Sequence, residues 1–315
     1  MTLPQHKCQL VIDSACDLPH EVVESLGVDM MLFPYEMNDG EHIDDFGQSM
    51  SSEDFYGRLI DGDVSRTAQI PIPVMTEKFR HAAETKTPTV FLCLSSGLTG
   101  TYDTMCRVAD EVREEFPEAE IYVVDTLLAS IAEGFLVLEA VKQRNNGLTA
   151  AELAAWAEEA RYYVHGYFTV DDLMYLRRGG RIPPIAAAAG SKLDIKPVLK
   201  FDLTGHLAID GLVRGRKKSV KSVAKLLNEN AIEPDRAQIV FGNAVCEKDM
   251  RSLEGMYSGP KALFVETSIG PVIGSHVGPG MVAASFWGPD RRKEASFGDR
   301  IAKNVKKRNS PPFPK

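Results

Sequence analysis

The stretch FLCLSSGLTGTYDTM, residues 91–105, contains a strand, a loop and the start of a helix in direct succession. Its first four residues form an apolar run of the kind found in buried strands. Two serines and two glycines follow, and from Thr101 onward apolar side chains recur at spacings of three and four, as at Met105, Ala109 and Val112. This order predicts a strand that ends in a serine-rich loop and a helix that begins near Thr101.

The same alternation extends through the first half of the chain. Apolar runs at residues 8–13, 89–94 and 121–125 each precede a more amphipathic segment. Helices are expected at about 127–144, where the sequence NNG provides a stop, and again after Thr149. Repeated strand-helix units are typical of a parallel sheet with crossover helices. We therefore expect an N-terminal α/β domain over residues 1–162.

The pattern changes near residue 163. A strand at 163–170 and a short, glycine-terminated helix at 171–176 are followed by a basic amphipathic helix at about 217–227. The glycine- and proline-rich segment 269–280 predicts a long loop. We expect a C-terminal α+β domain with a mixed sheet over 163–290, then a helical or tail extension over 291–315 with a disordered end. Further strands are expected at 197–202, 206–213, 238–243, 262–266 and 282–288.

Composition favours a soluble cytoplasmic protein. Of 315 residues, 44% are hydrophobic and 25% are charged, and no segment reaches the roughly 20 apolar residues of a membrane helix. The N-terminus is interrupted by Asp13 too early for a signal peptide. Five scattered cysteines without a C-x-x-C pair fit a reducing compartment and predict no zinc site.

The formal net charge of -8 conceals a basic strip. Residues 177–225 contain five Arg and seven Lys against three Asp, so the rest of the chain is strongly acidic. Nucleic-acid-binding proteins usually carry net positive charge, and no aromatic residues alternate with these charges. The strip, which includes Arg178, Arg181 and Arg214, is either a solvated surface or a docking surface for one anionic partner. We expect docking and no nucleic-acid binding.

The serine-rich loop has two interpretations. Its backbone N–H groups and hydroxyls, including Ser95 and Ser96, converge at the expected helix N-terminus, which suits a small anion. Simple helix capping is the alternative, and the G-K-[ST] ending of a Walker loop is missing. Ser96, His276 and Asp13 could instead form a hydrolase triad, although the G-x-S-x-G elbow is absent.

Two further segments offer polar groups to a ligand. His276 lies between Gly274 and Gly278, so its imidazole would be the main polar group of the expected loop beside Ser275. No second ligand at helical spacing accompanies it, and we expect no metal site. The segment SRTAQIPIP, residues 65–73, presents Thr67 beside prolines that favour extended backbone and exclude a helix. A connector is its simplest interpretation.

Six segments together resemble one family. LVIDSACDLP, SSGLTGTYDT, DDLMYLRRGGRI, IKPVLKFDLTGHL, VRGRKK and IGPVIGSHVGPG occur in the order and spacing of the DegV family of bacterial fatty acid-binding proteins, over about residues 8–287. The resemblance implies a two-domain α/β fold that encloses one fatty acid at the domain interface, without catalysis of its own and without a further cofactor. It also implies, for some members, a partner fatty acid kinase whose ATP-binding subunit makes an acyl phosphate.

The resemblance assigns residues to roles one by one. Binding of the fatty acid carboxylate is expected at Thr67, Ser95, Ser96 and His276, and docking of the kinase at Arg178, Arg181 and Arg214. The surrounding loops would be supported by Asp13, Ser14, Gly97, Gly274 and Gly278. The family commonly has T-S-Q-P-S-P where this chain has TAQIPIP, so Ala68 and Ile70 replace a hydroxyl and a proline near the expected head-group site. An acyl-ester hydrolase that uses Ser96 and His276 is the alternative function.

Overall fold

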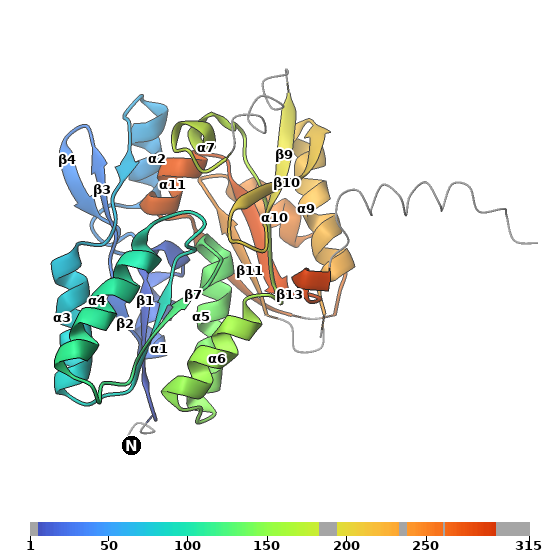
Figure 1. Cartoon of the computed structure of the whole chain (residues 1–315). Coiled ribbons are helices and arrows are strands. Elements are labelled where there is room, and N and C mark those ends of the chain that lie inside the picture. The colour runs from blue at the N-terminus through green and yellow to red at the C-terminus, as the bar shows by residue number, and fades with distance from the viewer. Residues whose placement is uncertain (1–5, 183–193, 233–237, 261, 294–315) are drawn as a thin grey trace, which may run out of the picture.

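The computed structural model describes residues 6–182, 194–232, 238–260 and 262–293. Two β-sheets with flanking helices lie side by side, and a small third sheet sits at one end of the first (Figure 1). The arrangement is the expected α/β two-domain fold, with a parallel sheet formed by the N-terminal half and a mixed sheet formed by the C-terminal half.

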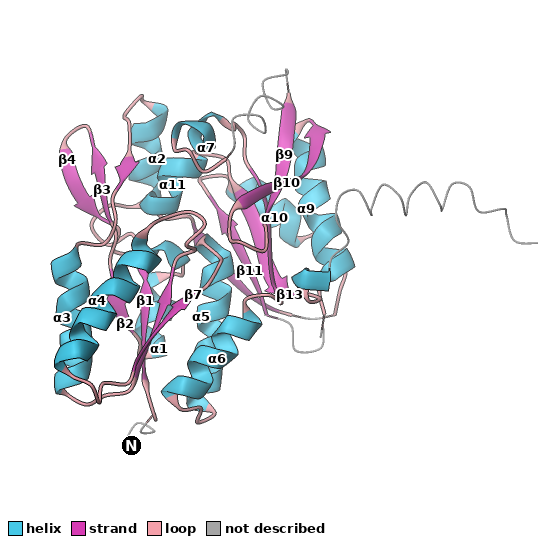
Figure 2. Ribbon diagram, in the orientation of Figure 1, coloured by secondary structure: helices cyan, strands magenta, loops and turns pink. Residues whose placement is uncertain are grey.

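The N-terminal sheet has four parallel strands in the order β2-β1-β6-β7. They are β1 (Gln9–Asp13), β2 (Asp29–Met31), β6 (Thr89–Cys93) and β7 (Ile121–Asp125). The strands predicted at 8–13, 89–94 and 121–125 are confirmed. Helices α1 (His20–Leu26), α3 (Ile72–Glu84), α4 (Thr101–Glu115) and α6 (Ala150–Ala160) flank this sheet (Figure 2). Helix α4 begins at the predicted residue, and Thr149 caps α6 through a capping box with Glu152.

The C-terminal sheet has six strands in the order β10-β9-β8-β13-β11-β12, all antiparallel except the β11/β12 pair. Each predicted strand of this half is present, and α9 (Arg216–Asn230) and α10 (Glu247–Glu254) pack on one another beside the sheet. The strand bounds are β8 (Val164–Thr169), β9 (Ile195–Phe201), β10 (Leu207–Arg214), β11 (Gln238–Asn243), β12 (Leu263–Ser268) and β13 (Val282–Trp287).

Helix α5 (Ser130–Asn145) connects the two halves. It belongs to the N-terminal part of the chain, yet it packs against β8, β11 and β13 of the six-stranded sheet and against α6. Most of its residues are therefore buried. The division at residues 162 and 163 stays a prediction. Of the predicted extension over 291–315, only the short 3-10 helix η3 (Arg291–Lys293) lies within the described residues.

Local patterns did not indicate a three-stranded antiparallel sheet in the order β4-β3-β5. It consists of β3 (Pro34–Met37), β4 (Gly40–Ile43) and the two-residue strand β5 (Arg66–Thr67). Helix α2 (Ser52–Ile60) lies between β4 and β5 in the sequence. Pairing of Tyr35 with Thr67 places the candidate threonine on this sheet. The prediction that 65–73 excludes a helix was wrong at its end, because α3 begins at Ile72 and its proline occupies the first turn, where no N–H is needed.

The loop predicted at 269–280 is also wrong in part. Residues Pro271–Val277 form helix α11, with Pro271 in the first turn and Gly278 at the C-cap. Glycine inside a helix is unfavourable by about 1 kcal/mol relative to alanine, which is why composition indicated a loop. Gly274 is tolerated because a Cβ there would lie 2.6 Å from the Tyr56 hydroxyl, so tight packing requires its absence.

Candidate functional site

A cavity of about 370 Å³ lies between the two sheets. Its walls come from the loop after β6, the first turn of α5, the inner face of β8, β9 and β13, and helix α11. Most lining side chains are apolar, among them Phe33, Leu94, Leu98, Phe168, Phe201 and Met281. Among the described residues, the lining side chains with polar groups are Thr67, Gln69, Thr99, Ser130, Tyr167, Arg181 and His276. Such a volume and such a lining are typical of a site for one small ligand.

Thr67 and His276 meet at the cavity wall, although 209 positions separate them. The Thr67 Oγ1 and His276 Nε2 atoms are 2.8 Å apart. Burial, together with the nearby charge of Arg181, lowers the pKa of His276 from 6.5 to about 4, so the imidazole is neutral at pH 7. Its Nδ1 atom is buried without a hydrogen-bond partner among the described residues. Two of the four residues predicted to bind the carboxylate are thus brought together, Thr67 from strand β5 and His276 from helix α11, where a loop was expected.

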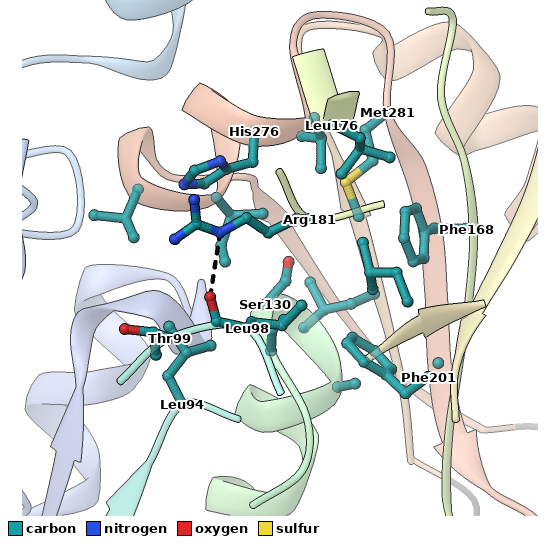
Figure 3. Close-up of a pocket in the computed structure, with 18 of the residues that line it drawn as sticks. Leu94, Leu98, Thr99, Ser130, Phe168, Leu176, Arg181, Phe201, His276 and Met281 are labelled. Carbon is teal, nitrogen blue, oxygen red and sulfur yellow. Dashed lines mark hydrogen bonds between the residues drawn. The ribbon is translucent and has the colours of Figure 1, made fainter. Parts of the chain in front are cut away.

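Arg181 lies beside His276 at the same part of the cavity (Figure 3). Its Nε donates a hydrogen bond to the Leu98 carbonyl at 3.2 Å, and a terminal nitrogen donates to the Gly179 carbonyl. Burial lowers the pKa of this guanidinium, which nonetheless keeps its charge at pH 7. The resemblance assigned Arg181 to partner docking; in the structure its half-buried side chain lines the cavity.

The serines of the opening motif are placed elsewhere. Ser95 is fully buried, and its hydroxyl donates to the Gly205 carbonyl at 2.9 Å in the β9–β10 turn. Ser96 is exposed, and its backbone N–H donates to Asp125 Oδ1 at 3.1 Å. Neither residue is among those that line the cavity. The loop contributes Thr99 and Gly100 to the wall in their place.

Asp13 supports the fold and does not join a triad. Its Oδ1 accepts from the Ala15 N–H at 3.0 Å and its Oδ2 from the Leu94 N–H at 2.7 Å. Burial raises its pKa to about 7. Within the described residues, Ser96, His276 and Asp13 each bond to other groups and not to one another, so they do not form a Ser-His-Asp triad.

The remaining supporting residues hold the walls together. Ser14 Oγ accepts from the N–H of Phe33, a lining residue, at 3.0 Å. A Cβ on Gly97 would lie 2.6 Å from the Gly205 carbonyl carbon, so the serine-rich loop and the β9–β10 turn touch through backbone. Gly278 has a φ of 68° and lies against the Tyr175 ring, where a side chain would be both strained and obstructed.

Two buried carboxylates that sequence reasoning missed position α11. Asp17 Oδ1 accepts from the Gly270 N–H at 2.8 Å, and Asp44 Oδ2 accepts from the Val272 N–H at 3.1 Å. Both therefore cap the helix that carries His276. Asp17 Oδ2 also accepts from the hydroxyl of Ser130, a lining residue, at 2.5 Å. No local signal announces these contacts, since they join residues more than 100 positions apart.

The departures from the family motif fall at two different places. Ala68 lines the cavity and is exposed, as are Gln69 and Gly100, so the cavity opens at this side. Gln69 accepts a hydrogen bond from the Thr104 hydroxyl at 3.1 Å. Ile70, in contrast, is 1% exposed and packs in the core.

Arg178 and Arg214 point to solvent. Both are exposed, and the Arg178 guanidinium lies 5.0 Å from the centre of the Tyr175 ring on α7 (Met174–Arg178).

Within the described ranges, no group of three or more His, Cys, Asp or Glu side chains is arranged to hold a metal ion. In the same part of the chain, every helix is too short or too polar to span a bilayer.

Fold and site together define a class: α/β proteins of two sheets that enclose a ligand-sized apolar cavity with a polar, cationic side. The chain matches the model of the DegV family, described as "Uncharacterised protein, DegV family", over residues 7–288. A DegV domain-containing protein of Clostridium perfringens is 34% identical over 284 residues, which cover 90% of this chain and 98% of that protein. The chain belongs to the DegV family, which confirms the resemblance noted in the sequence.

Solved structures of this family have the same fold. A DegV family protein from Thermus thermophilus, described as binding fatty acid, superposes with a TM-score of 0.77 at 27% identity, over 90% of this chain and 99% of that one. DegV of Bacillus subtilis, described as a fatty acid binding protein, gives a TM-score of 0.78 at 25% identity, over 90% and 100% of the two chains. These neighbours are described as binding proteins.

Proposed function

We propose that this chain binds one long-chain fatty acid, with the hydrocarbon tail in the cavity and the carboxylate beside Thr67, His276 and Arg181. One observation carries the proposal: a cavity with mostly apolar walls brings a guanidinium, an imidazole and a hydroxyl together at one side. An apolar ligand without an acidic group would offer no counter-charge to the Arg181 guanidinium, which in the described structure donates only to neutral carbonyl groups. The fatty acid-binding relatives support the same ligand class.

The tail provides most of the affinity and the head group provides the orientation. Burial of about fourteen methylenes contributes on the order of 10 kcal/mol before ordering costs, at about 0.8 kcal/mol each. A carboxylate in such a cavity needs a charged partner, or it takes up a proton. Because His276 is neutral at pH 7, Arg181 supplies the positive charge, and Thr67 and His276 supply hydrogen bonds.

The chain itself is a carrier and not an enzyme in this proposal. It presents the carboxylate to the ATP-binding subunit of a fatty acid kinase, where a carboxylate oxygen attacks the γ-phosphorus of ATP, ADP leaves, and an acyl phosphate forms. Two features support a docking surface: the exposed guanidinium of Arg178 and that of Arg214. All five cysteines are free, which supports a cytoplasmic location.

Lipid extraction of the purified protein tests the ligand. The protein is denatured, extracted with organic solvent, and the extract is analysed by mass spectrometry against a protein of equal size purified in parallel. We expect about one fatty acid per chain. An empty extract, followed by failure to take up added oleic or palmitic acid, would overturn the proposal.

The partner is tested separately with the candidate kinase subunit and ATP. We expect acyl phosphate to form only when both proteins are present. Arg178→Ala is expected to reduce kinase engagement while the bound fatty acid is retained. Loss of the ligand with intact kinase binding would reverse the assignment of this residue.

A further inference from the structure

The apolar side of the cavity has a specific packing arrangement between neighbouring strands. Strands β8 and β9 are antiparallel, and Tyr167 pairs with Lys200. One step along the same register places Gly166 opposite Phe201, and both residues line the cavity. In Figure 3, Phe201 and Phe168 lie across the cavity from His276 and Thr99. The aromatic pair therefore lies away from the polar side.

The absence of a side chain at Gly166 allows this packing. A Cβ there would lie 3.1 Å from Phe201 Cε2 and 2.9 Å from the Cβ of Ala132 on α5. Both distances are shorter than van der Waals contact, so the Phe201 ring and helix α5 can both pack against this position only because it is glycine. The Phe201 side chain is buried, with 6% of its surface exposed, and its ring stands 6.4 Å from that of Phe168.

We propose that the Phe201 ring, seated over Gly166, closes the apolar end of the cavity and thereby limits the length of the acyl chain that the protein accepts. The inference rests on the proposed fatty acid binding and names the element that selects among fatty acids. A longer chain must displace the ring, whereas a shorter one leaves buried space unfilled. Each methylene that gains or loses burial changes the affinity about fourfold.

Competitive loading tests the proposal. Delipidated protein is incubated with an equimolar mixture of saturated fatty acids from lauric to arachidic acid, and the bound acids are extracted and quantified by mass spectrometry. Phe201→Ala is expected to move the bound distribution to longer acids, by about fourfold in ratio for each methylene newly buried. Gly166→Ala is expected to move it to shorter acids, because the new methyl group pushes the ring into the cavity.

Gly211→Ala is the matched control. Gly211 also lies on a strand of this sheet, its φ is not positive, and a Cβ there meets no atom within 4 Å. We expect the wild-type distribution from this variant. If Phe201→Ala does not fold, Phe201→Leu replaces it with the same expected direction and a smaller shift.

The outcomes distinguish this inference from the proposed function. Wild-type protein that loads no fatty acid would overturn both. Wild-type protein that loads fatty acid, with folded Phe201 and Gly166 variants that keep the wild-type distribution, would overturn only the role of Phe201.

Discussion

Replacing Arg181 by methionine tests whether its guanidinium is the charge partner of the carboxylate in the proposed fatty acid complex. Methionine retains an apolar stem of similar length, so the packing of the cavity wall changes little while the positive charge is removed. Among the described residues that line the cavity, Arg181 is the one Arg or Lys, and His276 beside it is neutral at pH 7. In the variant, the carboxylate would lose the guanidinium charge, and Thr67 and His276 would remain as its polar neighbours.

The expected loss follows from the position of the guanidinium. Removing one partner of a buried, hydrogen-bonded charge pair costs about 2 to 5 kcal/mol, and the half-buried setting of Arg181 places it at the lower end because solvent screens exposed charges. A loss of about 2 to 3 kcal/mol weakens binding roughly thirty- to 150-fold. The tail still contributes its burial, so binding is reduced and not abolished.

The assay is displacement of a fluorescent fatty acid by palmitic acid and, in parallel, by hexadecanol, which has the same chain without the charge. Wild-type protein should prefer the acid strongly, and Arg181→Met should lose most of that preference. Arg178→Met is the control, because Arg178 is exposed and does not line the cavity. Equal preference for the acid in Arg181→Met and wild type would refute the reasoning, as would an equal loss in Arg178→Met.

Three further outcomes are expected. Thr67→Val removes the hydroxyl that bonds His276 and should weaken fatty acid binding about tenfold in the displacement assay, with Thr67→Ser near wild type; unchanged binding in the valine variant would contradict this role. The His276 ring should show no protonation between pH 8 and 5 by NMR, because its pKa is about 4. The imidazole takes up a proton near pH 6.5 in the unfolded chain and not in the folded one, so this residue lowers the free energy of unfolding as the pH falls from 6.5 to 4. The free energy of unfolding of His276→Gln should therefore decrease less steeply over this pH range. A ring titration centred near 6.5 would show that the site is open to water. Asp13→Asn should destabilise the fold by about 1 to 3 kcal/mol in urea denaturation. The Asp13 side chain accepts hydrogen bonds from the N–H groups of Ala15 and Leu94, and the NH₂ of an asparagine would face one of these two donors. A denaturation midpoint equal to that of wild type would count against the described hydrogen bonds.

Local patterns were sufficient for the long elements. The apolar run at 121–125 predicted β7 to the residue, and the spacing of Met105 and Ala109 predicted the start of α4. These elements bury one continuous face or stripe, and the period of that face is written directly in the sequence. Short strands such as β5 carry no such period, so the sheet that holds Thr67 was not predicted.

Helix α11 shows why the composition of residues 269–280 predicted a loop where the structure has a helix. Its glycines and prolines indicate a loop, but Asp17 and Asp44 cap its N-terminus from the other end of the chain. These contacts, with the packing of Gly274 on Tyr56, offset its low intrinsic helix propensity.

The sequence by itself determined the α/β alternation, the family and the types of polar residue that a carboxylate ligand requires. Only the tertiary structure decided which of them face the cavity. Arg178 and Arg181 belong to one motif, yet Arg178 is exposed to solvent and Arg181 lines the cavity. The Ser95 hydroxyl donates its hydrogen bond to the Gly205 carbonyl and does not face the cavity. The physical reason is that a side chain's partner depends on how distant segments pack, and residue type and spacing along one segment do not contain that information.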